Sequence, residues 1–221
     1  MLPANGWVEH RDTYANTDKI PASMTVCPSA SKACVNACLR YSGRGNMGNV
    51  IDARLERTML FIQHREEFYS RLNQELRKLD KRTPSDSITA IRLNIMSDIN
   101  HWHYLKRYEN ITPSDYPRLS FYDYTKVWKH LENIGKNVHF TFSWSGENRE
   151  KCLEALALGV NVAVPFDSGY ALPAEFLGYP VIDGDEYDYR PLDKSGVIVG
   201  LKEKRTPGRK RLGNFIVTPS E

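Results

Sequence analysis

The sequence predicts an α/β fold in which helices cover a largely parallel sheet. From residue 88 onward, stretches with the two-residue periodicity of strands alternate with helical stretches, which is typical of βα units. The stretch VNVAVPF at 160–166 is apolar almost throughout, as strands buried on both faces of a parallel sheet are. Polar residues follow one strand after another, and sites in such folds form at the carboxyl ends of strands.

Length and composition favour a single domain over residues 1–221, with 1–23 as an N-terminal extension and 24–217 as the folded core. The 221 residues suffice for one sizeable core, and 41% hydrophobic with 26% charged residues is ordinary for a globular chain. The N-terminus lacks a basic start followed by an apolar run, and no stretch reaches the roughly 18 apolar residues of a membrane span. We therefore expect a cytoplasmic protein with no membrane contact and with reduced thiols.

The first half of the chain predicts one long helical region and two strands. Apolar residues recur with helical spacing over 49–82, with Asn49 as the cap. An unbroken helix of this length would be roughly 45 Å long, so we expect two helices or a kink. Residues 88–98 alternate as a strand that places Ile91, Leu93 and Ile95 on one face, and 118–126 predict a second strand.

The second half predicts two helices between further strands. Residues 127–135 suit a short helix ending at Gly135, and 147–159 suit an amphipathic helix ending at Gly159. The predicted strands are 137–146, 160–166, 179–183, 195–201 and 213–217.

Polar residues at the ends of five strands suggest a shared pocket. They are Asn94, Ser97, Asp98, Asp123, Lys126, Ser143, Ser145, Asn148, Asp167, Asp183, Asp185 and Asp188. Each of them alone is as well explained as a helix cap or turn residue, because Ser, Asp and Asn are common there. Their recurrence after strand upon strand favours the pocket.

Three of the four cysteines, Cys27, Cys34 and Cys38, lie within twelve positions. Cys34 and Cys38 are four residues apart and would share a face of a helix or turn, so the three thiols can converge on one centre. Three cysteines suffice for a [4Fe–4S] cluster whose fourth iron is open. A structural zinc ion needs a fourth ligand, for which His101, His103 or Cys152 are candidates. The bland alternative is three small buried or incidental cysteines.

The remaining chemically active residues suggest structural roles. Cys152 shares a helical face with apolar residues, which predicts core packing. His101 and His103 flank Trp102 in a predicted loop, where surface histidines are common, although a ligand or proton-transfer role is the alternative. The other histidines discussed, namely His64, His130 and His139, are predicted to be structural. The glycines of SGRGNMGN match no phosphate-loop pattern.

Positive charge gathers near the C-terminus, in KEKRTPGRKR at 202–211. A Pro-Gly pair in this stretch predicts a loop tip or hairpin. Arg209, Lys210 and Arg211 could contact a nucleic-acid backbone weakly and without sequence preference, since no aromatic residue is present for base stacking. A solvated loop without a partner is the alternative.

The chain resembles a phage-encoded family of unassigned function. The resemblance is carried by the blocks CPSASKACVNACLR, IRLNIMSDI, LSFYDYTK, HFTFSWSGEN, GVNVAVPF, VIDGDEYDYRPLD and GVIVGLKEK, in this order over residues 24–217. Members carry a CPGA-x3-C-x3-CYA type segment, from which this chain departs at Ser29 and at Leu39-Arg40. A phage origin would place the protein in the host cytoplasm.

More distantly, the chain is similar to radical S-adenosylmethionine (SAM) enzymes, whose cysteine triad follows the first barrel strand. The spacing here is C-x6-C-x3-C, whereas that superfamily uses C-x3-C-x2-C. The resemblance implies a partial, TIM-like (β/α) barrel of about six parallel strands, with the cysteine loop after a short first strand at 24–26. It also implies an iron–sulfur cluster on the triad and a small-molecule ligand, S-adenosylmethionine included, at the strand ends. The positions that match by placement are Asn94, Ser97, Asp98, Asp123, Ser143 and Ser145.

The sequence therefore favours a small iron–sulfur enzyme with an unnamed substrate. The alternative is a binding module in which a structural zinc or iron–sulfur centre stabilises the fold, and the basic segment contacts nucleic acid or a host protein.

Overall fold

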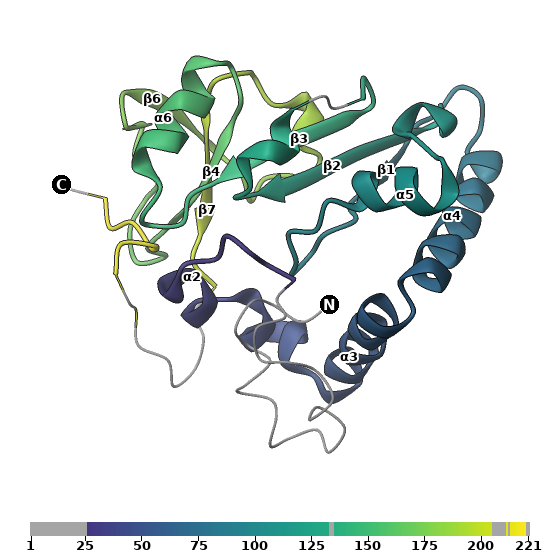
Figure 1. Ribbon diagram of the computed structural model, residues 1–221. Coiled ribbons are helices and arrows are strands. Elements are labelled where there is room, and N and C mark those ends of the chain that lie inside the picture. The colour runs from purple at the N-terminus through teal and green to yellow at the C-terminus, as the bar shows by residue number, and fades with distance from the viewer. Residues whose placement is uncertain (1–25, 133–134, 205–210, 212, 220–221) are drawn as a thin grey trace.

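The computed structural model of the protein describes residues 26–132, 135–204, 211 and 213–219. Within these residues, seven strands form one sheet with the order β1-β2-β3-β4-β7-β6-β5 (Figure 1). All neighbouring strands are parallel except β5 and β6, which form an antiparallel hairpin. The strands are β1 (Thr89–Ile91), β2 (Leu119–Thr125), β3 (Val138–Ser143), β4 (Val162–Phe166), β5 (Glu175–Phe176), β6 (Tyr179–Asp183) and β7 (Ile198–Lys202).

The sheet confirms the predicted α/β class with a mostly parallel sheet. It is open, because β1 and β5 stand at its two ends and do not pair with each other among the described residues. No closed barrel is therefore formed. The strand order is also not sequential, since β7 inserts between β4 and β6.

The α-helices are α2 (Lys32–Asn36), α3 (Gly48–Gln63), α4 (Arg65–Arg82), α5 (His101–Glu109) and α6 (Arg149–Ala157). In the chain, α2, α3 and α4 precede the first strand, whereas α5 and α6 lie between strands. The short 3-10 helices are η2 (Leu39–Tyr41), η3 (Gly43–Asn46), η4 (Pro113–Asp115), η5 (Trp128–Leu131) and η6 (Arg190–Leu192). No helix among the described residues is long and apolar enough to cross a membrane.

The two faces of the sheet are covered by different segments. Trp102 of α5 packs edge-on against Phe121 of β2, and Cys152 of α6 lies in the same buried cluster as Phe142 of β3. The opposite face of β2 meets the connection between β6 and β7, where the Tyr189 hydroxyl donates to Ser120 Oγ at 2.8 Å. Right-handed crossovers explain this division, because the step from β6 back to β7 runs against the direction of the steps from β1 to β4.

Several predicted elements are confirmed. The helical region breaks at His64 between α3 and α4, as its length predicted. β2, β4 and β6 lie within the predicted stretches, and Gly159 follows α6 with a φ of +81°. The predicted Asn49 cap is wrong, because Met47 occupies the N-cap of α3.

The predicted strand at 88–98 is correct only for Thr89–Ile91. Beyond it, Asn94 turns the chain with its own side chain: Asn94 Oδ1 accepts from Ser97 Oγ at 2.6 Å and from the Ile99 amide at 3.1 Å. Such side-chain bonds replace ladder bonds. Ile95 is consequently 66% exposed and does not share a buried face with Ile91.

Four further expectations about helices and strands are corrected, and the first three concern elements that are shorter than predicted. The helix expected at 127–135 is only the 3-10 turn η5, and Gly135 does not have positive φ. The predicted strand at 213–217 is reduced to one bridge between Val217 and Phe166. Val26 lies in a bend, while 24–25 of the expected first strand lie outside the described residues.

The fourth correction is α5, which forms where a loop was predicted. Asn100 caps this helix by accepting from the His103 amide at 2.9 Å, and Asn110 ends it with a φ of +54°.

Candidate metal centre and strand-end site

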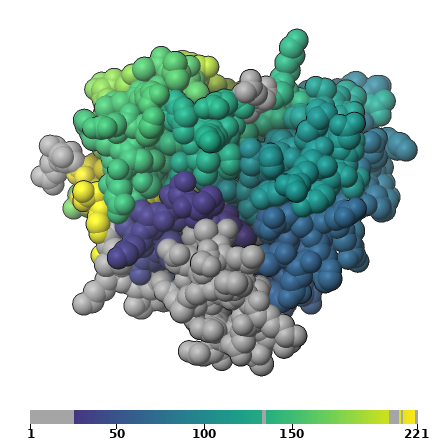
Figure 2. All heavy atoms as spheres, viewed as in Figure 1, coloured from purple at the N-terminus to yellow at the C-terminus, as the bar shows by residue number. Residues whose placement is uncertain are grey.

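The cysteine segment lies across the carboxyl ends of the parallel strands (Figure 1). The Val26 carbonyl accepts from the Asp98 amide at 2.7 Å, beyond the end of β1. Ser31 Oγ donates to the Ser145 carbonyl at 2.7 Å, beyond the end of β3. The segment, purple in Figure 2, lies between the teal and green strand region and the blue helices α3 and α4. The three clustered cysteines are therefore at the edge of the sheet where the polar strand ends meet.

Local sequence sets the path of the cysteine segment. Ser31 caps α2, because its Oγ accepts from the Cys34 amide at 3.1 Å while its hydrogen goes to Ser145. Cys27 Sγ donates to the Met96 carbonyl at 3.6 Å. Cys38 follows α2 and caps η2 in an extended conformation. All three thiols are half-buried.

Lys126, directly after β2, interacts electrostatically with all four cysteines. Burial lowers the pKa of the Lys126 ammonium, but Cys34, Asp98, Cys27 and Cys38 raise it by more, so that it lies above its usual value. Burial raises the pKa of the Cys38 thiol, and the neighbouring Cys34 raises it further, although the Arg40 amide and Lys126 act in the opposite direction. The three cysteines and Asp98 thus favour the charged form of Lys126.

The sulfur atoms of Cys27, Cys34 and Cys38 lie on one short segment, but they do not have the arrangement of metal ligands. No disulfide joins any of the four cysteines, all of which belong to the described residues. No group of three or more His, Cys, Asp or Glu side chains in the described part of the chain has an arrangement that would hold a metal ion. Binding of a metal by Cys27, Cys34 and Cys38 would require the side chains to turn towards one another.

Cys152 lies on α6, where its apolar helical face predicted core packing. It is fully buried on α6 among Ala155, Leu156 and Val162. Burial raises the pKa of its thiol to about 12. This cysteine packs in the core.

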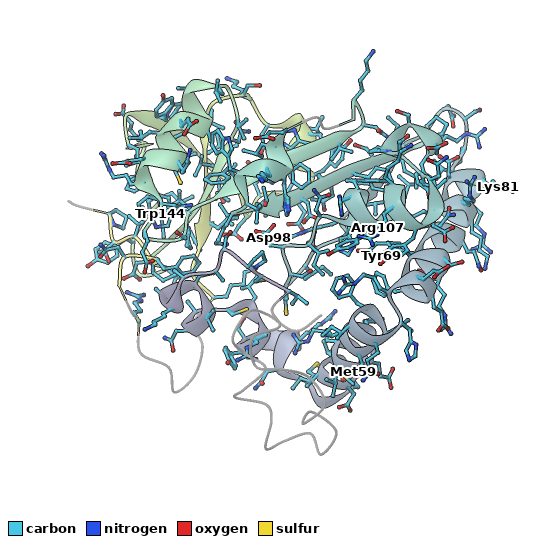
Figure 3. All side chains as sticks on the ribbon, viewed as in Figure 1. Met59, Tyr69, Lys81, Asp98, Arg107 and Trp144 are labelled. Carbon is cyan, nitrogen blue, oxygen red and sulfur yellow. The ribbon has the colours of Figure 1, made fainter. Side chains whose placement is uncertain are left out.

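Asp98, labelled in Figure 3, connects the cysteine segment to β2. Its carboxylate accepts from Thr125 Oγ1 and from the Lys126 amide, each at 2.7 Å. The same carboxylate lies 3.2 Å from His130 Nδ1. Asp98 is 8% exposed, so a buried charge is balanced by three donors.

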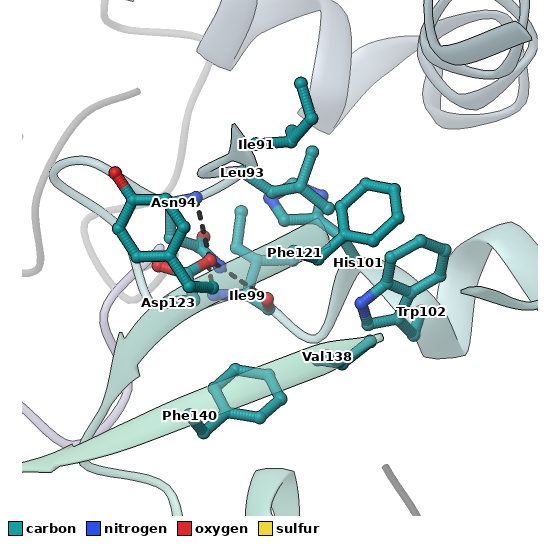
Figure 4. A pocket seen from close by; sticks show the side chains of 11 residues that line it. Ile91, Leu93, Asn94, Ile99, His101, Trp102, Phe121, Asp123, Val138 and Phe140 are labelled. Carbon is teal, nitrogen blue, oxygen red and sulfur yellow. Dashed lines mark hydrogen bonds between the residues drawn. The ribbon is translucent and has the colours of Figure 1, made fainter. Parts of the chain in front are cut away.

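Asn94 and Asp123 form a second buried pair, shown in Figure 4. Asp123 Oδ2 accepts from the Asn94 amide at 2.9 Å and from Asn94 Nδ2 at 2.8 Å. Burial raises the pKa of the Asp123 carboxyl to about 7, against the opposing effects of Arg92, Asn94 and the Tyr124 amide. Asn94 and Asp123 line a small cavity whose other walls are mainly apolar. Ser97 is joined to this pair through Asn94 Oδ1.

Ser143 and Ser145 lie at the end of β3 and are held by Asn148. Asn148 Oδ1 accepts from the Ser145 amide at 2.8 Å, and Asn148 Nδ2 donates to the Ser143 carbonyl at 3.0 Å. The structure therefore brings all six predicted residues to the edge that carries the cysteines. Of these six, Asn94 and Asp123 line the cavity of Figure 4.

The sequence analysis assigned no site role to His130 and predicted His101 to lie in a loop, whereas His101 is buried on α5. His101 also lines the cavity of Figure 4, and its Nδ1 lies 3.1 Å from the Tyr69 hydroxyl. Burial lowers the pKa of His101 to about 3, so the ring is neutral. The Asn100 cap before HWHY was the signal that places His101 on a helix.

In the basic segment, Arg209 and Lys210 lie outside the described residues. Arg211 is held by Asp167 and Glu203, with Nη2 2.7 Å from Asp167 Oδ1 and Nε 3.0 Å from Glu203 Oε2. These hydrogen bonds raise the pKa of the Arg211 guanidinium. The charge of Arg211 is thus balanced within the protein.

One comparison with known proteins identifies a relationship. The family model described as Gene product 88 matches residues 3–215, a match that fits a phage-type protein of unassigned function. Searches of curated proteins and of solved structures gave no significant match.

Proposed function

We propose that this chain, which belongs to the Gene product 88 family, is a small iron–sulfur protein that works as a radical SAM-like enzyme. Cys27, Cys34 and Cys38 would hold a [4Fe–4S] cluster. The observation that carries the proposal is that the segment with the three half-buried thiols is hydrogen-bonded to the carboxyl ends of the parallel strands. The three thiols also interact electrostatically with Lys126, which follows β2 directly. The parallel run from β1 to β4, which follows the chain order, is the part of the sheet that is compatible with a partial (β/α) barrel, and this barrel remains part of the proposal.

The donor set favours a cluster over zinc. A structural zinc ion needs four ligands, and the fourth-ligand candidates Cys152 and His101 already pack among other side chains. Cys152 is packed in the core, and His101 is buried beside Tyr69. His103 is exposed on α5 and remains a candidate. A cluster with three cysteine ligands leaves one iron open to a small molecule.

The residues of this chain would bind and orient the small molecule. When bound, the cluster would supply the electron that cleaves a carbon–sulfur bond of S-adenosylmethionine. Lys126 would offset the negative charge of three thiolates. The buried strand-end groups proposed to orient the ligand are Asn94, Ser97, Asp98, Asp123, Ser143 and Ser145.

The alternative remains a metal-stabilised binding module that contacts nucleic acid or a host protein. Its basic residues would be Arg209 and Lys210, because Arg211 already has two carboxylate partners. Such a module would hold zinc or a cluster without cleaving S-adenosylmethionine.

The test is anaerobic purification and reconstitution of the full chain, followed by iron, sulfide and zinc analysis and an S-adenosylmethionine cleavage assay. We expect about four irons per chain and the visible absorption of an iron–sulfur cluster. Each of Cys27→Ala, Cys34→Ala and Cys38→Ala should lose the iron. Cys152→Ala is the matched control and should keep it.

Equal loss of iron in Cys152→Ala and Cys34→Ala, with both variants folded by circular dichroism, would refute the ligand assignment. Stoichiometric zinc in place of iron would refute the cluster. An iron-loaded protein that leaves S-adenosylmethionine intact would refute the enzyme proposal and favour the binding module.

A further inference from the structure

We infer that Asp98 and His130 form a proton-transfer pair that serves a separate cavity beside α5 and η5. The cavity has a volume of about 250 Å³. Its lining among the described residues comprises Asn100, Trp102, His103, Lys106, Ile111, Thr112, Pro113, His130, Glu132, Gly135 and Phe140. This inference does not rest on the proposed cluster, since no cysteine lines the cavity.

Two side chains, Thr125 and Asp98, fix the orientation of the His130 ring. Thr125 Oγ1 donates to Asp98 Oδ1 at 2.7 Å and lies 2.9 Å from His130 Nδ1. The Thr125 hydroxyl has one hydrogen, for which Asp98 Oδ1 is the nearer acceptor and the Val127 carbonyl, at 3.4 Å, the more distant one. With that hydrogen on either acceptor, the Thr125 oxygen can only accept from Nδ1. Asp98 Oδ1 itself lies 3.2 Å from Nδ1. Neutral His130 therefore carries its proton on Nδ1 and has its lone pair on Nε2.

The environment suits Nε2 as a proton acceptor. The His130 ring is 8% exposed and packs against Phe140, with the ring centroids 6.2 Å apart. Among the described residues, none forms a hydrogen bond with Nε2. Nε2 is also not sealed from solvent, so a ligand can reach it. An imidazolium formed there would be stabilised by the Asp98 carboxylate, which is the arrangement that orients histidine bases in general.

The lining indicates the class of ligand. Trp102 and Phe140 supply aromatic walls, and Ile111 and Pro113 add apolar surface. Lys106 is the lysine that lines the cavity, and His103 and Glu132 are the other titratable groups beside His130. A small aromatic molecule with an acidic hydroxyl fits these groups. Its O–H bond would break and an N–H bond would form at Nε2, leaving the ligand anion near the Lys106 ammonium.

The first test needs no substitution. Long-range proton–nitrogen NMR spectra of the full chain with ¹⁵N-labelled histidine distinguish the two neutral tautomers. We expect His130 to be the Nδ1–H tautomer, and Asp98→Asn should reduce this preference. An Nε2–H tautomer in the unsubstituted protein would overturn the inference.

The second test uses 4-nitrophenol, whose ionised form is yellow, as the probe. We expect the protein to bind it with formation of the yellow anion below the pH at which the free probe ionises. His130→Gln should weaken binding at least tenfold and abolish the colour. His64→Gln, an exposed histidine between α3 and α4, is the matched control and should behave like the unsubstituted protein. The inference would also be overturned if the unsubstituted protein did not bind 4-nitrophenol, or if His130→Gln gave as much yellow anion as the unsubstituted protein.

Discussion

At the scale of single residues, the least expected feature is a buried ion pair on the face of the sheet opposite α5. The side chains of Arg190 and Asp193 are both fully buried, with Arg190 Nη1 3.3 Å from Asp193 Oδ2. The Arg190 guanidinium also lies over the Tyr187 ring, 4.8 Å from its centroid. Removing two charges from water is expensive, so such a pair depends on both partners being present.

This pair predicts a strongly non-additive effect of substitution. Arg190→Met leaves an unpaired buried carboxylate and should lower the free energy of unfolding by about 3–5 kcal/mol. Arg190→Met combined with Asp193→Leu removes both charges and should cost clearly less than the sum of the single substitutions. Urea unfolding followed by circular dichroism measures these differences.

The exposed pair of Arg71 and Glu67 on α4 is the control. Its removal should cost less than about 1 kcal/mol. Additive costs for Arg190→Met and Asp193→Leu would mean that the two charges do not stabilise each other.

At the scale of elements, the sequence predicted best where periodicity and burial agree. Burial alternates along Leu119–Thr125 of β2, as expected for the strand predicted at 118–126, although the buried Asp123 and Thr125 are polar. The sequence predicted least where side chains hydrogen-bond to the backbone. Asn94 ends β1 early and Asn100 begins α5, and neither bond leaves a periodic pattern.

Gly146, after β3, allows the segment at 213–217 to dock closely. Its φ is +84°, and a Cβ there would lie 2.7 Å from the Phe215 amide nitrogen and 2.9 Å from the Asn214 carbonyl carbon. The docked segment accepts a hydrogen bond from Trp144 Nε1 at the Asn214 carbonyl, at 2.9 Å. The segment and the end of β3 therefore fit together only without a side chain at position 146.

Gly146→Ala should destabilise the protein by more than the strain of a positive φ alone, which costs about 1–2 kcal/mol. Gly178→Ala is the matched control, because Gly178 has a φ of +82° and open space around the position of a Cβ. Urea unfolding measures both variants, and the indole N–H resonance of Trp144 reports undocking. Equal destabilisation with an unchanged resonance would show that the segment does not need Gly146.

At the scale of the molecule, strand order and the assembly of the site could not be predicted from the sequence. Local periodicity does not encode the insertion of β7 between β4 and β6. The clustering of Cys27, Cys34 and Cys38 was evident because it is local. Their neighbour Lys126 is about ninety residues away in the chain, and only the fold brings it to them.

The core consists of two buried clusters that meet at β3. The first contains Phe121 and Val138 beside α4 and α5, and the second contains Phe142 and Val162 beside α6. β3 and β4 pair through only two residue pairs, Phe142 with Val162 and Ser143 with Ala163. The pairing of β3 with β4 therefore decides whether the two halves of the fold, each built around one of these clusters, unfold together.

We expect one cooperative transition, because β3 contributes side chains to both clusters. With 5-fluorotryptophan, ¹⁹F resonances of Trp102 and Trp144 report the first and second halves separately, and their midpoints in urea should coincide. Phe142→Ala should cost about 3–5 kcal/mol and lower both midpoints equally. Leu158→Ala, at a residue that is 69% exposed, should leave both unchanged. A midpoint that falls for Trp144 but not for Trp102 would show two independently unfolding halves and contradict the single domain.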